Sequence, residues 1–194
     1  MRRTLWLSVF CLWSWGALAE DVTSVYTAWD LEKTCKQVEK GDDMTFAGSW
    51  SCPGQGGVRM LVSISDDRSF VGFGRYPAKS CAYRRTFFGL NTALSPVEWR
   101  MKRGRPIAAI QRWRVVAGED GSTATWLVVT AIKGTEACPV HYVAGSYPNA
   151  NAIARQAADD IAEDFDCESE VATVDSTVGG PGVEFISCRE ARQE

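Results

Sequence analysis

Seven cysteines in a chain of 194 residues restrict its fold more than any other sequence feature. Cys11 falls in an apolar N-terminal segment, and the other six are spread through the rest of the chain. An even number of cysteines in an exported protein predicts disulfide bonds, because the compartment is oxidising. Zinc sites need closely spaced ligand pairs such as CxxC, whereas these successive cysteines lie 17 to 57 residues apart. We therefore predict three disulfides among Cys35, Cys52, Cys81, Cys138, Cys167 and Cys188.

The pairing of these cysteines is open at the level of sequence, since six cysteines can pair in fifteen ways. We expect Cys35 to pair with Cys52 and Cys138 with Cys167, because both bonds close short loops between neighbouring elements. A bond between Cys81 and Cys188 would tie the C-terminal tail to the body of the domain. Each bond contributes about 3 to 4 kcal/mol when treated as a restriction of the unfolded chain.

The first nineteen residues have the pattern of a secretory signal peptide. Arg2 and Arg3 precede an apolar run over residues 5–15, and Ala17 and Ala19 form a small-x-small cleavage sequence. The apolar run is shorter than the roughly twenty residues of a transmembrane helix. We expect cleavage after Ala19, no transmembrane segment after cleavage, a single domain over residues 20–194, and a periplasmic or secreted location.

Short hydrophobic runs between turn-forming residues predict β-strands over most of the chain. The separators are rich in Gly, Pro and Asp, as in the glycine-rich stretch 53–57 and the acidic pair Asp66 and Asp67. This spacing predicts an antiparallel meander of about six to seven strands. The expected strands cover residues 45–52, 58–65, 70–76, 97–102, 107–116, 125–132 and 140–144.

One amphipathic helix is predicted near the C-terminus, over residues 150–165. Ile153, Ala157, Ile161 and Phe165 recur every four residues and form one apolar stripe, which we expect to cover a face of the sheet. Residues 22–40 show no sustained period and are expected to be loosely structured, and a short strand is expected to end at Cys188. The fold class is therefore α+β, stabilised by disulfides.

The sequence lacks the residues that most kinds of enzymatic catalysis require. The chain has a single histidine, His141, and no GxSxG sequence for a nucleophilic serine, so we interpret His141 as structural. One histidine and no close cysteine pair give no metal centre, and the glycines at 54, 56 and 57 form a turn rather than a phosphate loop. No cofactor is expected. Paired carboxylates of a glycoside hydrolase remain an alternative, because sequence does not measure their separation.

Basic residues are concentrated in one segment of an otherwise acidic chain. Residues 84–114 contain eight basic residues and one acidic residue, Glu98. A hairpin through Gly104 would align four basic side chains on one face, with Trp99 and Trp113 on the opposite face as core. These candidate ligand-binding residues are Arg100, Lys102, Arg112 and Arg114. In the alternative interpretation, they pair with the acidic helix and loops of the same domain.

This charge distribution and the absence of a catalytic motif favour a non-enzymatic exported binding module. The basic hairpin would engage an anionic glycan, a lipid headgroup or an acidic protein. Nucleic acid is not an expected partner, because the whole chain is acidic, with a net charge of -3. A carboxylate-dependent hydrolase of envelope polymers and a passive structural protein of the envelope are the alternatives.

Several stretches also resemble a group of small exported bacterial proteins that share a cysteine framework and have no assigned activity. They are residues 50–54 (WSCPG), 126–130 (WLVVT), 138–142 (CPVHY), 148–152 (PNANA) and 164–167 (DFDC). The resemblance implies export and the cysteine framework. It implies no functional residue.

Overall fold

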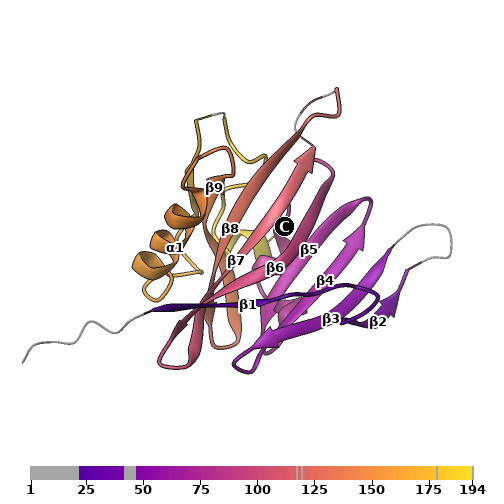
Figure 1. Cartoon of the computed structure of the whole chain (residues 1–194), viewed down its shortest axis with the longest axis horizontal. Helices are drawn as coiled ribbons and strands as arrows, with labels where there is room; N and C mark the ends of the chain where they lie inside the picture. Colours follow the sequence, from indigo (N-terminus) through magenta and orange to yellow (C-terminus); the bar gives the residue numbers. More distant parts are fainter. Residues whose placement is uncertain (1–21, 42–46, 117, 119, 178, 194) are drawn as a thin grey trace, which may run out of the picture.

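A computed structural model describes residues 22–41, 47–116, 118, 120–177 and 179–193 (Figure 1). The expected signal peptide at residues 1–19 lies outside the described residues. Ten strands and one α-helix are found in the described part of the chain. The strands are β1 (Thr23–Thr27), β2 (Lys36–Lys40), β3 (Gly48–Gln55), β4 (Val58–Ser65), β5 (Arg68–Gly74), β6 (Asn91–Lys102), β7 (Arg105–Val116), β8 (Thr123–Lys133), β9 (Glu136–Ala144) and β10 (Thr173–Asp175). The helices are α1 (Ala150–Ile161) and the 3-10 turns η1 (Pro77–Lys79), η2 (Ala82–Arg84) and η3 (Glu190–Arg192).

The strands form one sheet in the order β10-β9-β8-β7-β6-β5-β4-β3-β2, with β1 paired to β6. Neighbours are antiparallel except for two short parallel pairs, β5 with β6 and β9 with β10. The predicted antiparallel arrangement with one helix is confirmed in outline, and the domain is richer in sheet than the meander we expected. The added strands are β1, β2 and β10.

Two expectations about the chain ends were wrong. Residues 22–40 are not loosely structured, because they supply β1 and β2. No strand ends at Cys188, and the C-terminal segment instead pairs through Thr173–Asp175. All of β2 and β10 is exposed, so neither strand carries the alternation of apolar and polar residues that reveals a half-buried strand.

Two-residue turns with positive φ at both positions connect several of the antiparallel pairs. Gly56 and Gly57 join β3 to β4, and Arg103 and Gly104 join β6 to β7. Turns of this backbone geometry match the right-handed twist of the paired strands. Arg103, with a φ of 51°, is one of the non-glycine residues in the left-handed region. These turns place short, defined loops at one end of the sheet.

The main core lies between the β3–β5 half of the sheet and the β6–β9 half. Trp99 is completely buried there, and its ring meets Phe73 edge-on at 5.5 Å between centroids. Met60 and Val62 of β4 face the same core, as does Trp113 of β7. The prediction that Trp99 and Trp113 are core residues is confirmed. Burial of these large side chains joins the two halves.

A second core lies between α1 and the outer face of β7–β9. Ala154, Ala158 and Ala162 have no exposed surface and pack among Ala108 and Val129 of the sheet. The buried row is therefore displaced by one residue from the predicted stripe, of which Ile153, Ala157 and Ile161 are only half-buried. Small side chains allow the helix backbone to approach the sheet closely, and the larger residues flank the contact.

Three disulfides join the six cysteines in the pairing that we expected. They are Cys35–Cys52, Cys81–Cys188 and Cys138–Cys167. The first ties the start of β2 to β3, and the third ties β9 to the segment after α1. Cys81–Cys188 spans 107 residues and holds the C-terminal segment against η2. None of the helices in the described residues is long and apolar enough to span a membrane.

The lengths of the closed loops predict unequal contributions to stability. Replacing Cys81 and Cys188 with Ser should lower the free energy of unfolding by about 5 kcal/mol, more than the roughly 3 to 4 kcal/mol that we expected for each bond. Replacing Cys35 and Cys52 should lower it by about 3 kcal/mol. The difference arises because the first bond spans 107 residues and the second 17. Urea denaturation followed by tryptophan fluorescence measures both losses. An equal loss in the two variants would contradict this account.

Candidate functional site

The four predicted ligand-binding residues lie on the outer face of β6 and β7, the face that α1 covers. Lys102 is opposite Arg105, whereas Arg112 is opposite Leu94 and lies near the other end of the hairpin. Arg100 is opposite Ala108, so Arg112 is four residues farther along β7, or about 13 Å at the usual rise of a strand. The hairpin therefore does not gather the four side chains into one cluster.

Arg100 is buried and its guanidinium group is held by partners within the domain. Its Nε and Nη2 atoms donate to the two carboxylate oxygens of Asp159 on α1, at 2.8 and 2.6 Å. Its Nη1 atom donates to the Ser24 hydroxyl, and Nη2 also reaches the Val22 carbonyl at 3.2 Å. Arg100 thus joins β1, β6 and α1. This contact matches the alternative interpretation, in which the basic residues pair with the helix.

A second link between β6 and α1 joins the buried Glu98 to Arg155, whose side chain is 38% exposed. Arg155 Nε donates to Glu98 at 2.6 Å, and the Ser24 hydroxyl also donates to Glu98. Burial acts to raise the pKa of Glu98, but these hydrogen bonds and the Arg155 charge outweigh it and hold the pKa below its usual range. The sequence does not predict this pair, because its only signal is the single acidic residue, Glu98, in the basic segment 84–114.

The remaining three predicted residues differ in their surroundings. Lys102 is half-buried and contacts the Glu163 carboxylate, which follows α1. Arg112 Nη2 donates to the Asn151 side chain of α1 at 2.8 Å. Arg114 is exposed and lies between Thr92 and Thr125 of the neighbouring strands. Arg100 and Arg112 therefore contact α1, whereas Arg114 is exposed.

A cavity of about 380 Å³ opens at the end of the sheet, where the β3–β4, β6–β7 and β8–β9 turns meet. Four basic residues and one acidic residue line it. Two of the basic residues, Arg103 and Arg105, are exposed and flank the β6–β7 turn. The other basic lining residues are Lys102 and Lys133, the acidic one is Glu163, and the apolar ones are Val58, Pro106, Ile107 and Ile132.

Close contacts between the turns build this basic cavity. A Cβ atom on Gly56 would lie only 2.7 Å from Pro106 Cδ, so the β3–β4 turn rests directly on the start of β7. Lys133 Nζ donates to the Phe165 carbonyl at 2.7 Å, which holds the segment after α1 at the cavity. Lys133 lies outside the basic segment 84–114, and for that reason it was not among the predicted ligand-binding residues.

The chemistry of this cavity suits anion binding. Arginine guanidinium groups present paired donors that match phosphate, sulfate and carboxylate oxygens. Glu163 is the single carboxylate among the described residues that line the cavity, whereas glycoside hydrolysis needs two. In the described part of the chain, no three His, Cys, Asp or Glu residues are grouped to hold a metal ion.

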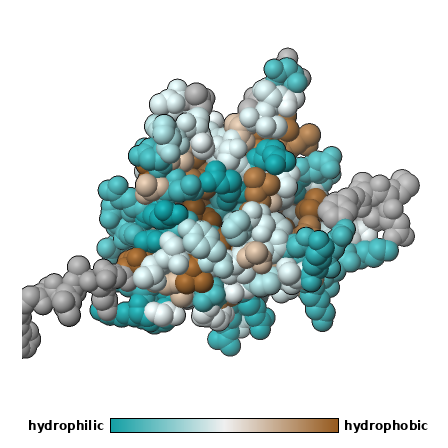
Figure 2. All heavy atoms as spheres, viewed as in Figure 1, coloured by the Kyte–Doolittle hydropathy of each residue, from teal (hydrophilic) through white to brown (hydrophobic). Residues whose placement is uncertain are grey.

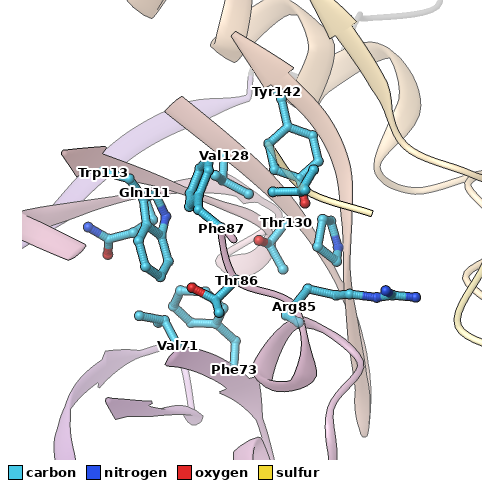
Figure 3. A pocket seen from close by; sticks show the side chains of 13 residues that line it. Val71, Phe73, Arg85, Thr86, Phe87, Gln111, Trp113, Val128, Thr130 and Tyr142 are labelled. Atoms are coloured by element: carbon cyan, nitrogen blue, oxygen red, sulfur yellow. The ribbon is translucent and has the colours of Figure 1, made fainter. Parts of the chain in front are cut away.

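A second, much smaller cavity lies inside the main core (Figure 3). Phe73 of β5, Trp113 of β7 and Tyr142 of β9 line it, together with Gln111 and with Phe87 of the segment between η2 and β6. Burial raises the pKa of Tyr142, so its hydroxyl stays protonated. The volume, about 20 Å³, suffices for about one water molecule and not for a ligand.

His141 lies apart from both cavities and connects β9 to β10. Its Nδ1 atom is 2.7 Å from the Thr173 hydroxyl, and its Nε2 atom is 3.3 Å from an Asp175 carboxylate oxygen. Burial lowers the pKa of His141, and the Asp175 charge opposes this effect. The contacts agree with the structural role that we assigned to this residue.

Comparisons of the chain with protein-family models, with curated proteins and with solved structures found no match. The resemblance to a group of small exported bacterial proteins therefore stays a prediction. The candidate site is supported by the arrangement of its residues and not by a related protein.

The Arg100–Asp159 pair gives a test of the buried link. Asp159→Ala removes the carboxylate that accepts two hydrogen bonds from the buried Arg100 guanidinium and leaves only the more distant carboxylate of Glu98, at 4.0 Å. We expect the free energy of unfolding to fall by about 3 kcal/mol. The neighbouring Asp160 is exposed, and Asp160→Ala should change the free energy of unfolding by less than about 0.5 kcal/mol. Urea denaturation of both variants makes the comparison. Equal, small effects would show that the pair contributes little.

His141 predicts a pH dependence of stability with a definite sign. Because the pKa of His141 is lowered in the folded state, the unfolded chain binds a proton first as the pH falls below about 6.5. Stability should therefore be full above that pH and decline as the pH falls from there through the lowered pKa of the folded state. His141→Gln should remove this decline, since the chain has no other histidine. A decline of the same size in the variant would refute the assignment.

Proposed function

We propose that the protein is a non-enzymatic, exported binding module that holds an anionic group in the cavity at the β6–β7 turn. The observation that carries the proposal is the grouping of four basic side chains around one open cavity, facing a single carboxylate. Its volume of about 380 Å³ falls within the range of known ligand sites. The three disulfides support export, because such bonds persist in oxidising compartments.

The proposal keeps the basic hairpin of the sequence-based hypothesis and moves the site from its strand face to its turn. Arg100 is occupied by Asp159, and its charge is neutralised. Arg105 is exposed at the cavity, where a phosphate, sulfate or carboxylate group can reach it. An anionic glycan, a lipid headgroup and an acidic protein all present such groups, so the shared chemistry is anion recognition.

Glu163 acts as an internal competitor in this site. Its carboxylate already contacts Lys102 at the wall of the cavity. An incoming anion must therefore share or displace that contact. The carboxylate also repels a second negative charge at this short range.

Pairs of charge-removing variants test this function. Arg103→Gln combined with Arg105→Gln should weaken the binding of inorganic pyrophosphate at low salt by at least about tenfold, because two cations are lost from the cavity. Glu163→Gln should strengthen binding several-fold. Isothermal titration calorimetry across a salt series measures both changes, and the wild-type affinity should fall steeply as salt rises.

The matched control is Arg112→Gln combined with Arg114→Gln, which removes the same charge from the strand face. This control should bind pyrophosphate with the wild-type affinity. No binding by the wild-type protein at low salt, or an equal loss in the two double variants, overturns the proposed site.

A further inference from the structure

Additional basic residues surround the cavity at the same end of the sheet. β5 ends at Gly74, which pairs with Arg59 at the start of β4. A Cβ atom on Gly74 would lie 3.5 Å from the Thr135 carbonyl oxygen, so the end of β5 lies beside the β8–β9 turn. Gly134 of that turn lines the cavity. The backbones of Arg59, which follows the cavity-lining Val58, and of Arg75 therefore lie at this end of the sheet, and both residues are exposed.

An exposed aromatic residue lies within this basic surface. Tyr76 lies two residues after the end of β5 and is 49% exposed. Arg75 and Lys79 lie 5.5 and 5.8 Å from the centroid of its ring, close enough for cation–π contacts. Tyrosine beside basic residues is typical of surfaces that meet the headgroup region of a membrane.

Basic residues outnumber acidic ones over the whole end of the molecule. We call this surface the basic end; its cations are Arg59, Arg75, Lys79, Lys102, Arg103, Arg105 and Lys133, and the nearby carboxylates are Glu136, Glu163, Asp164 and Asp166. Three of these carboxylates have partners. Glu163 contacts Lys102, Glu136 accepts a hydrogen bond from the Cys81 amide at 2.7 Å, and Asp166 accepts one from the Glu168 amide at 3.0 Å. Hydrophilic residues gather over the same turns at the lower edge of the molecule in Figure 2.

We infer that the basic end docks on the surface of an anionic lipid bilayer. In this arrangement the cavity takes the phosphate of one headgroup, the surrounding cations meet neighbouring headgroups, and Tyr76 enters the interfacial layer. The inference rests on the proposed function and names its partner. A small soluble anion would need only the cavity, whereas cations on several separate turns, with a half-exposed tyrosine among them, suit an extended negative surface.

Vesicle binding by the oxidised protein without its expected signal peptide, residues 20–194, tests this inference. Vesicles of 70% phosphatidylcholine and 30% phosphatidylglycerol should bind at least about tenfold more tightly than vesicles of phosphatidylcholine alone, with an affinity that falls as salt rises. Tyr76→Ala combined with Lys79→Gln should weaken this binding by about tenfold. The same variant should keep the wild-type affinity for pyrophosphate, because neither residue lines the cavity.

The matched control removes an aromatic residue and a cation from the other end of the sheet. Phe88→Ala combined with Arg114→Gln should leave vesicle binding unchanged, although Phe88 is 66% exposed. Pyrophosphate binding without preference for anionic vesicles overturns the membrane inference and leaves the proposed function intact. The absence of both kinds of binding overturns both. Equal losses of vesicle binding in the two double variants also overturn the inference, since the basic end would then have no special part.

Discussion

The alanine row of α1 lies directly on the outer face of β7–β9, and the arrangement of charge in the molecule depends on this contact. Because Ala154, Ala158 and Ala162 have no exposed surface, the helix lies close enough for its polar flank to reach the neighbouring strand β6. Asp159 and Arg155 then meet Arg100 and Glu98 at hydrogen-bonding distance. A bulkier helix face would hold these charged groups apart.

These ion pairs decide which basic residues remain available to a partner. The segment 84–114 is strongly basic, yet Arg100 is neutralised by Asp159 within the domain. The helix covers the strand face, whereas Glu163 is the single carboxylate among the described residues that line the cavity at the turns. The candidate site is therefore at the end of the sheet. Its position follows from the placement of the helix rather than from the local density of arginine.

The turns that form the cavity are well defined, although loops are usually the most mobile part of a fold. Two-residue turns leave little freedom, and the contact of Gly56 with Pro106 fixes one turn against the next strand. The disulfide Cys138–Cys167 ties β9 to the segment after α1, where Phe165 accepts the Lys133 hydrogen bond. Cations held on such well-defined turns lose less conformational entropy on binding than cations on a flexible loop.

The sequence by itself determined the elements whose signals are local. The turn residues marked most of the central strands, the four-residue periodicity placed α1, and loop length with chain order suggested the disulfide pairing that the structure contains. The edge strands β2 and β10 were missed, because their exposed residues carry no apolar alternation and their pairing depends on distant partners. The ion pairing of Arg100 and the formation of the cavity at the turns were also decided by the tertiary structure. Electrostatic neutralisation and cavity formation both depend on distances between residues far apart in the chain, such as Arg100 and Asp159 or Arg105 and Lys133, and no local pattern encodes those distances.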